Sequence, residues 1–520
     1  MSTAESSPRR IVPAAVVGGG VSGLIAAREL AIAGFSVTLL EATGDLGGCV
    51  AAHEVAGLVL DAGAESFATR SSAVADLLED LGLGDEIVYP AGGGAWLYSA
   101  EAHGPSRHGR DGEAAADAGL AQPLPQTGIL GIPGDPLADD VRALIGQTAA
   151  LRAAADLAMP VSKSLTDGPM SLGALVRSRM GSAVLDALVT PVVSGVHSAD
   201  PDTLDVDVVA PGLRAAVVEH GSLARAVAAL RRAAPAGSAV AGIRGGDQRL
   251  TQALVADLED RGVELRRGVR VTRLRRHDDG YTVSLSESAG GRGTSGPGAA
   301  GPDAAGPDSV RPDCATPDEA LEVQRLVVAT DGPSAVDLLG QLEPALNEHR
   351  PEAGAGVRLV TLVVDRPELD EAPRGSGVLV APDASDVAAK ALTHATAKWQ
   401  WLAEEAGPGT HVLRLSYGRL SEERARVADA DDATLYATAL ADAGTLLGLA
   451  LTEADVLGWD VVRYRGALPF ATTGHRRRVE TVREILEGFP QLDAVGAWLS
   501  GTGLAAVVAD TRSRTRISVS

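Results

Sequence analysis

Residues 14–41 read AAVVGGGVSGLIAARELAIAGFSVTLLE, and this stretch decides the fold of the first part of the chain. An apolar run ends at a glycine-rich turn, a segment with helical spacing follows over 23–34, and a β-rich run covers 35–40. The order of these segments predicts a strand, a turn, a helix and a second strand. Such a unit is typical of a nucleotide-binding domain.

Three glycines and one carboxylate in this unit have separate expected roles. Gly18, Gly20 and Gly23 form the pattern G-x-G-x-x-G directly after the first strand. The first two let the backbone approach a pyrophosphate at the helix N-terminus, and Gly23 lets the helix pack closely on the strand. Glu41 can accept hydrogen bonds from ribose hydroxyls, and its charge would repel a 2′-phosphate. We therefore predict dinucleotide binding, with a purely structural turn as the alternative.

Length, charge and cysteine content restrict the class of protein. A chain of 520 residues is too long for one core. The net charge of −22 argues against nucleic-acid binding, so an anionic ligand must meet a local group of arginines. Cys49 and Cys314 are too few for a disulfide framework, which predicts a reducing cytoplasm and no structural metal. The N-terminal residues lack a separate signal-peptide pattern and no run of about 18 apolar residues occurs, so we expect no spanning helix, with peripheral membrane contact left open.

The later chain indicates a discontinuous nucleotide domain. Segments 245–276, 326–339 and 497–510 have strand and helix patterns that fit returns of the same domain. Two stretches rich in Gly, Ala, Pro and Asp, 101–122 and 287–320, are predicted to be disordered insertions, and the second lengthens a hairpin between YTVSLS and LEVQRLVVAT. Residues between the insertions that are rich in Ala and Leu predict a helical lobe.

The sequence after Glu41 favours FAD over NAD. A second glycine pair, Gly47 and Gly48, is followed by DAGAES at 61–66. This Leu-Gly-Gly segment resembles one that lies along the cofactor in flavoproteins of the amine-oxidase type. An ordinary turn is the alternative interpretation of the glycine pair.

Longer segments resemble the protoporphyrinogen oxidase and coproporphyrinogen III oxidase family, most closely its Gram-positive and actinobacterial coproporphyrinogen III branch. They occur in the family's order: DAGAESFATRSSAVADLLEDLGLGDEIV, LPQTGILGIPGDP, SLGALVRSRMGSAVLDALVTPVVSGVHSADPDTLDVD, THATAKW and RYRGALPFATTGHRRRV. The resemblance implies oxidation of coproporphyrinogen III to coproporphyrin III in haem biosynthesis. Hydride would pass from meso carbons to flavin N5, with oxygen as acceptor and peroxide as product.

Three other functions stay open at this point. They are protoporphyrinogen IX oxidation, the activity of another amine-oxidase-like flavoenzyme, and non-catalytic carriage of a flavin or tetrapyrrole. The resemblance also implies a tetrapyrrole substrate and a transient contact with a ferrochelatase, while the oligomeric state is not predicted.

The resemblance transfers cofactor contacts residue by residue. We expect FAD to be contacted by Gly18, Gly20, Ser22, Gly23, Glu41, Gly47, Gly48, Ala64, Glu65, Ser66, Val271, Tyr464, Gly501, Gly503 and Leu504. The last three open a helix whose N-terminus would face the flavin pyrimidine and stabilise negative charge on it.

Substrate contacts are predicted from chemistry because coproporphyrinogen carries four propionates. The candidates are Arg70, Lys163, Arg177, Ser198, Lys398 and Arg419. His197 and His394 could assist proton removal if they lie near the ring. Flavin chemistry needs no side-chain nucleophile or metal, so we predict neither.

The predicted fold is α/β, with a discontinuous Rossmann-like FAD-binding domain, a mixed-sheet substrate domain and an α-helical lobe. The FAD-binding domain would comprise 11–95, 236–340 (with the insertion 287–320) and 460–520; the substrate domain 96–122 (a strand plus a disordered insertion), 206–235 and 341–459; and the helical lobe 123–205.

Overall fold

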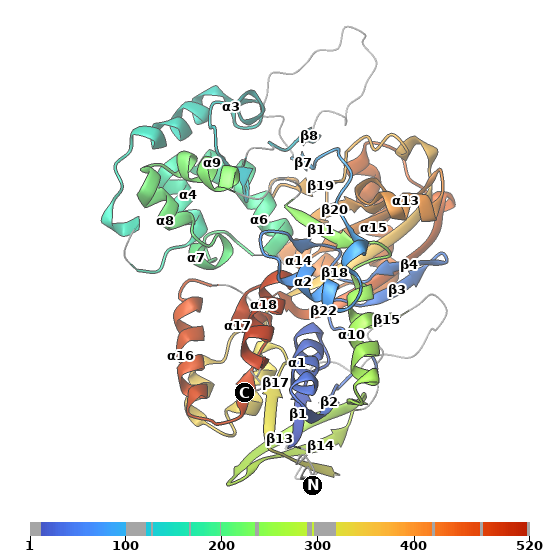
Figure 1. The fold of residues 1–520 in the computed structure, drawn as a ribbon. Coiled ribbons are helices and arrows are strands. Elements are labelled where there is room, and N and C mark those ends of the chain that lie inside the picture. Colours follow the sequence, from blue (N-terminus) through green and yellow to red (C-terminus); the bar gives the residue numbers. More distant parts are fainter. Residues whose placement is uncertain are drawn as a thin grey trace, which may run out of the picture.

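The structure is a computed structural model with three regions, which Figure 1 shows as a helical lobe at the upper left, a large sheet at the upper right and a nucleotide-type domain below. It describes residues 12–99, 121–125, 128–165, 168–197, 199–233, 239–288, 294–295, 319–418, 422–468 and 472–516. The predicted α/β fold class is confirmed.

A five-stranded parallel sheet organises the lower region, in the order β12-β2-β1-β17-β23. Within it, β1 (Val12–Val17), α1 (Val21–Ile32) and β2 (Phe35–Leu40) form the predicted strand, helix and strand. The other strands come from later parts of the chain: β12 (Glu264–Arg266), β17 (Arg325–Val328) and β23 (Leu492–Ala494). The sheet is therefore assembled from segments that are far apart in sequence.

Both faces of this sheet are buried, as expected for parallel strands. Ala14 and Val16 face a core that includes α1, α10 (Gln248–Asp260) and α18 (Leu504–Thr515), whereas Ala15 and Val17 face the opposite core. The second core contains three further pieces: the sheet β13-β14-β16, α11 (Gly332–Leu339) and α16 (His475–Glu487). Alternate side chains of the apolar strand β1 therefore pack into two different cores.

The predicted long hairpin exists, with one correction. β14 (Gly280–Glu287) pairs antiparallel with β16 (Glu319–Val323), on either side of the insertion. The run LEVQRLVVAT is not one strand, because Gln324 separates β16 from β17, which pairs with β1 instead. Within the stretch predicted to be disordered, Thr294–Ser295 (β15) pair with β22 (Val456–Leu468), and most of the remainder lies outside the described residues.

The upper sheet is mixed and follows the order β15-β22-β18-β21-β20-β19-β7-β8. Its members besides β15 and β22 are β18 (Ala355–Asp365), β21 (Thr410–Tyr417), β20 (Ala391–His394), β19 (Gly377–Val380), β7 (Trp96–Tyr98) and β8 (Ala121–Pro123). Only β19 and β7 pair in parallel among its described strands. α15 (Asp432–Leu447) packs on the sheet and shares its core. Since β22 crosses residue 460, the boundary placed there by sequence falls inside a strand of this sheet.

The helical lobe has its own apolar core. α3 (Asp139–Ala154), α4 (Leu172–Met180) and α6 (Thr190–His197) contribute to it. So do the later helices α7 (Val206–Val209), α8 (Leu213–His220) and α9 (Leu223–Ala233). The sequence assigned 206–235 to the substrate domain, but the boundary at residue 205 does not separate two cores.

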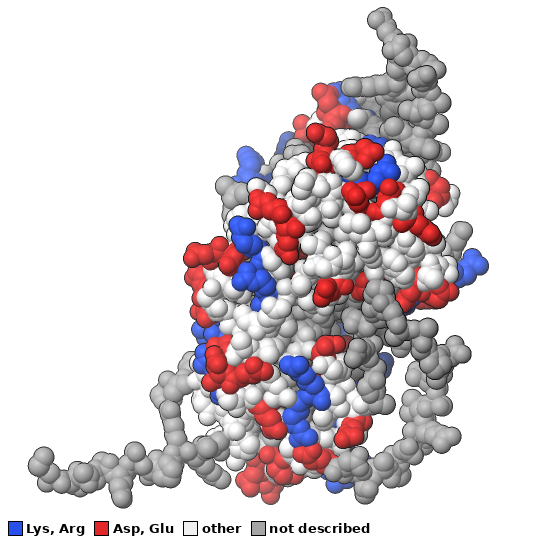
Figure 2. Space-filling model, turned by 90° about the vertical axis from the view of Figure 1, so that its right-hand side faces the viewer, with Lys and Arg blue, Asp and Glu red and all other residues white. Residues whose placement is uncertain are grey.

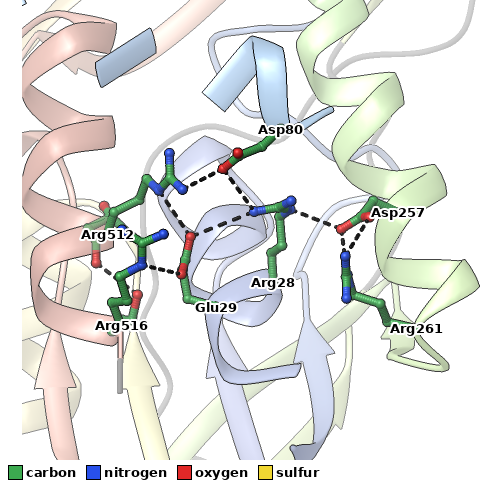
Figure 3. Close-up of polar contacts among 9 residues, drawn as sticks. Arg28, Glu29, Asp80, Asp257, Arg261, Arg512 and Arg516 are labelled. Carbon is green, nitrogen blue, oxygen red and sulfur yellow. Dashed lines mark hydrogen bonds and ion pairs between the residues drawn. The ribbon is translucent and has the colours of Figure 1, made fainter. Parts of the chain in front are cut away.

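A network of ion pairs joins four helices of the nucleotide domain (Figure 3). Arg28 and Glu29 of α1 are almost fully buried, at 4% and 3% exposure. Arg28 pairs with Asp257 of α10 at 3.0 Å, while Glu29 pairs with Arg512 of α18 at 3.1 Å. The remaining members are Asp80 of α2 (Ala73–Asp80), Arg261 and Arg516. We call these seven residues the basal network; they connect helices from all three parts of the nucleotide domain.

The surface reflects the acidic composition. On the face drawn in Figure 2, Asp and Glu are spread from one end of the molecule to the other, with smaller groups of Lys and Arg between them. Among the described residues, no helix combines the length and apolar character needed to cross a membrane.

Candidate cofactor site

The first glycine turn is fixed by sterics and leaves open space beside it. Gly18 has φ +106°, and a Cβ there would lie 2.6 Å from the Ala329 carbonyl oxygen. A Cβ on Gly23 would lie 1.8 Å from the Gly18 oxygen, so both residues are required by the protein itself. A Cβ on Gly20, at the N-cap of α1, meets no atom within 4 Å. Gly20 therefore faces space in which a ligand could approach the amides of the α1 N-terminus.

The second glycine pair lies against this turn. Gly47 donates its N–H to the Gly19 carbonyl at 2.8 Å, and a Cβ on Gly48 would lie 3.3 Å from the Gly20 Cα. Gly47 and Gly48 both have positive φ, +104° and +61°. The two glycine segments are separate motifs in the sequence, but they lie side by side in the fold. We call Gly18–Gly20 together with Gly47 and Gly48 the glycine cradle.

Glu41 is held at the carboxyl end of β2, beside the cradle. Its Oε2 accepts a hydrogen bond from the Gly19 N–H at 2.7 Å, and its Oε1 accepts from the Thr43 N–H at 2.7 Å. These bonds fix the carboxylate while leaving further lone pairs available. The side chain can therefore serve as an acceptor for hydroxyl groups of a nucleotide.

A continuous path of contacts leads from the cradle to residues 61–66. The Ala64 N–H donates to the Cys49 carbonyl at 2.9 Å. Gly63 is equally confined, because a Cβ there would lie 2.1 Å from the Cys49 oxygen and 2.9 Å from the Tyr464 hydroxyl. Burial raises the pKa of the half-buried Tyr464, which keeps its hydroxyl neutral. The sequence-predicted residues Ala64 and Tyr464 therefore lie on the same path.

Glu65 forms an ion cluster with two cations from the upper sheet region. Lys398 Nζ lies 2.7 Å from Glu65 Oε1, and Arg414 Nη1 lies 2.5 Å from Glu65 Oε2. Burial disfavours the charged carboxylate, but the two cations together lower the pKa of Glu65 to about 2. We call Glu65, Lys398 and Arg414 the junction cluster, because it joins the two regions.

Asp61, which sequence reasoning missed, caps α10 beside this cluster. Its two carboxyl oxygens accept N–H groups of Asp247 at 3.0 Å and Gln248 at 2.9 Å. Burial raises the pKa of Asp61 to about 6 and, with the Asp61 charge, raises that of Asp247 well above its usual value. Asp61 and Glu65 therefore have opposite shifts within one short segment.

The predicted cofactor contact near the C-terminus, at residues 501–504, also borders open space. α18 begins at Leu504, and Cβ atoms on Gly501 and Gly503 meet nothing within 4 Å. Leu504 shares the core of α1 with Ala64. Ser22 is buried in the first turn of α1, and Val271 is buried on β13 (Val269–His277). Apart from Val271, the described cofactor candidates therefore lie in one of three places. These are the glycine cradle and the residues beside it, the segment from Cys49 to Ser66 with Tyr464 beside it, and the N-terminus of α18.

The substrate candidates are scattered. Arg177 forms a two-pronged ion pair with Asp202, at 2.8 and 2.6 Å, and Lys398 is held by Glu65. Arg70 is exposed and pairs with no carboxylate among the described residues; Lys163 is also exposed but has an interaction partner. Ser198 and Arg419 lie outside the described residues, as does the side chain of His197.

His394 does not line an accessible surface. It is 1% exposed, and its Nε2 lies 3.0 Å from Nδ1 of His411. Burial, with a contribution from His411, lowers the pKa of His394 to about 3. The predicted proton-removal role conflicts with this enclosed position, which no substrate could contact.

A cavity of about 610 Å³ lies between the helical lobe, the edge strands β7 and β8, and the residues 381–383 that follow β19. Its charged lining consists of Arg177 and four carboxylates: Asp186, Asp200, Asp202 and Asp383. Neither the glycine cradle nor the junction cluster contributes to the lining. This excess of negative charge disfavours propionates there.

The discontinuous parallel sheet and the glycine cradle define the nucleotide-domain fold of flavoproteins. A model of the family described as flavin containing amine oxidoreductase matches residues 21–300, and the chain belongs to this family. A flavin is therefore its cofactor class.

Relatives resemble the chain over almost its whole length. A Mycobacterium tuberculosis (strain ATCC 25618 / H37Rv) protein named coproporphyrinogen III oxidase is 29% identical over 501 residues, 95% of this chain and 94% of its own. A Bacillus subtilis (strain 168) protein of the same name is 24% identical, with 94% of both chains covered. A crystal structure from Exiguobacterium sp. 255-15 has a TM-score of 0.74 at 23% identity and covers 97% of this chain and 98% of its own, which shows the same fold.

Proposed function

We propose that the chain is an FAD-dependent oxidase that converts coproporphyrinogen III to coproporphyrin III, with oxygen as electron acceptor and hydrogen peroxide as product. The observation that carries this proposal is the similarity, over nearly the full length, to proteins named for that reaction. The family and fold support the redox class, and the substrate rests on the relatives.

The residues around the cradle fit FAD in particular. Gly20 leaves room for a pyrophosphate, whose charge suits the N-terminus of α1. Glu41 offers an acceptor for ribose hydroxyls and would repel a 2′-phosphate. The segment from Cys49 to Glu65 forms an extended surface that leads toward the upper sheet, and the cofactor would lie along it. FAD would supply the hydride acceptor that protein side chains lack.

Arg70 is the proposed contact for a propionate of the substrate. It follows β5 (Phe67–Ala68) closely in the chain, which places it beyond the end of the 61–66 segment. Its charge is exposed and has no described carboxylate partner, unlike Arg177 and Lys398, whose charges are already paired. A free guanidinium can form the two-pronged hydrogen bonds that carboxylates favour.

The product of this reaction is a metal-free porphyrin, so a ferrochelatase is the proposed recipient. We further propose a cytoplasmic location, in keeping with the resemblance and with the two cysteines of the chain. Contact with the recipient would be transient.

The test compares two substrates with the purified yellow protein. Coproporphyrinogen III and protoporphyrinogen IX are each mixed with enzyme under anaerobic conditions and then in air, while flavin absorbance, porphyrin fluorescence and peroxide are followed. Faster oxidation of coproporphyrinogen III supports the proposal. Faster oxidation of protoporphyrinogen IX would instead identify the chain as a protoporphyrinogen IX oxidase. Flavin that neither substrate bleaches contradicts porphyrinogen oxidation and favours a carrier or another flavoenzyme.

A matched pair of variants tests the cradle. Gly20→Val fills the open space and should give colourless, folded protein without FAD. Gly488→Val is the control, because Gly488 is exposed at the end of α16 with φ −72°, and a Cβ there meets only the Ile485 carbonyl oxygen, at 3.3 Å. Normal flavin content in Gly20→Val would refute the placement of the pyrophosphate.

A further inference from the structure

The junction cluster holds one more positive charge than negative charge. Glu65 is bound by both Lys398 and Arg414, and Arg414 Nη2 also donates to the Gly63 carbonyl at 2.6 Å. The three side chains are only 15%, 16% and 8% exposed for Lys398, Glu65 and Arg414. Charges in such a position are screened far less than surface charges.

The cluster lies at the end of the path that starts at the glycine cradle. Gly47 forms a β-bridge with Gly20, the Cys49 carbonyl receives the Ala64 N–H, and Glu65 follows directly. A dinucleotide whose pyrophosphate lies at Gly20 and whose ribose meets Glu41 would extend its other end along this wall. That other end carries the redox-active ring of a flavin.

Below about pH 6, other ionisable groups around the cluster add little compensating negative charge. Asp61 and Asp247 are the nearby carboxyls, and burial favours the neutral form of both. Tyr464 is kept neutral by burial, and Lys398 lies over the Trp399 ring, 5.0 Å from its centroid. The excess charge therefore persists where Asp61 is protonated and decreases as Asp61 ionises.

We infer that Glu65, Lys398 and Arg414 set the reduction potential of the bound flavin, because their excess positive charge stabilises the negative charge that a flavin gains on reduction. In this role Lys398 is a positioning and electrostatic residue that acts without touching the substrate, and it replaces the propionate contact predicted from sequence. The inference rests on the FAD site of the proposed function and is independent of the identity of the substrate.

The experiment measures the midpoint potential of the holoenzyme against an indicator dye at a fixed pH. Lys398→Met removes the excess charge and should make reduction about tenfold less favourable, a shift of about 30 mV to lower potential for a two-electron couple. Glu65→Gln leaves two cations and should shift the potential in the opposite direction by a similar factor. Lys398→Arg keeps the charge and should retain the wild-type value.

The control variant is Arg350→Met, which also removes one cation from an ion pair. Arg350 and Asp337 are paired at 2.7 Å but are 47% and 55% exposed, so the potential should stay at the wild-type value.

Three results would overturn the inference. They are shifts in the same direction for Lys398→Met and Glu65→Gln, shifts no larger than that of Arg350→Met, and folded Lys398→Met and Glu65→Gln proteins that hold no FAD, which would assign these two residues to cofactor binding alone. A wild-type protein that holds FAD but oxidises neither porphyrinogen would refute the proposed function and leave this measurement intact.

Discussion

The basal network and the junction cluster both connect distant parts of the chain through charge, but they are built differently. In the basal network, Glu29 pairs with three arginines and Asp257 with two, and its outer members are partly exposed. In the junction cluster a single carboxylate, Glu65, holds two cations that are nearly enclosed. Shared partners make the first arrangement tolerant of single losses, whereas the second depends on each of its members.

The largest expected difference comes from breaking one pair in each region. Arg414→Met strips Glu65 and the Gly63 carbonyl of a buried partner and should lower the free energy of unfolding by about 3–5 kcal/mol. Glu29→Gln leaves Arg28 with Asp257 and should cost about 1–3 kcal/mol. Urea unfolding gives both values. Only Arg414→Met should also reduce FAD content in folded protein, and FAD loss in Glu29→Gln would remove the contrast.

A second difference is in the pH dependence of stability. The pKa of Asp61 is higher in the folded protein, about 6, than its usual value of 3.8, so unfolding free energy falls as pH rises from about 4 to 6, by on the order of 2 kcal/mol. The stabilisation from Glu65 is present above about pH 4.5 and is lost as pH falls toward 2. Asp61→Asn should therefore remove the Asp61 part of the slope between pH 4.5 and 6, while the raised pKa of Asp247 maintains the remainder.

Asp257 of the basal network should show a different pH dependence from Asp61. Burial opposes its charge, but Arg261 and Arg28 hold its pKa below the usual value, so its stabilisation is lost only on acidification below about pH 3.8. Asp257→Asn should leave the slope between pH 4.5 and 6 unchanged. A lost slope in this variant instead of Asp61→Asn would reverse the assignment.

Salt should separate the two regions further. Asp80 is 42% exposed, and Asp80→Asn should cost less than about 1 kcal/mol at 0.1 M salt. This cost should shrink at 1 M salt, where the Debye length falls to about 3 Å. The cost of Arg414→Met should stay constant, as unfolding titrations at both salt concentrations can show.

The smallest effect is expected at the rim of the basal network. Arg261 pairs with Asp257 one helical turn away and is 35% exposed. Arg261→Ala should change the free energy of unfolding by about 0.3–0.5 kcal/mol. A loss above about 2 kcal/mol would show that the network has no redundancy.

Local patterns made the nucleotide unit predictable from sequence, and distance in the chain concealed the rest. The α1 turn follows from adjacent residues, and the hairpin of β14 and β16 follows from two runs that flank an insertion. Glu65 and Lys398 were each singled out, but for different ligands, because nothing local indicates that residues 333 positions apart form an ion pair.

Arg414 carried a signal that went unused. It interrupts the apolar strand THVLRLSY at a buried position, and an arginine in such a place needs a charged partner. The sequence signal of Asp61 was weaker, because its partners are backbone N–H groups 186 and 187 residues away. Charged residues inside apolar strands therefore deserve the same scrutiny as glycine motifs.

The assembly of the parallel sheet from distant segments sets an order of events during synthesis. β1 and α1 emerge early, yet α1 is secured by Arg512, which is 483 residues away from Glu29 along the chain. Until α18 has been translated, one face of α1 lacks its apolar cover and Glu29 lacks two of its cations. The early segments therefore reach their final packing only after the last helix of the chain has been made.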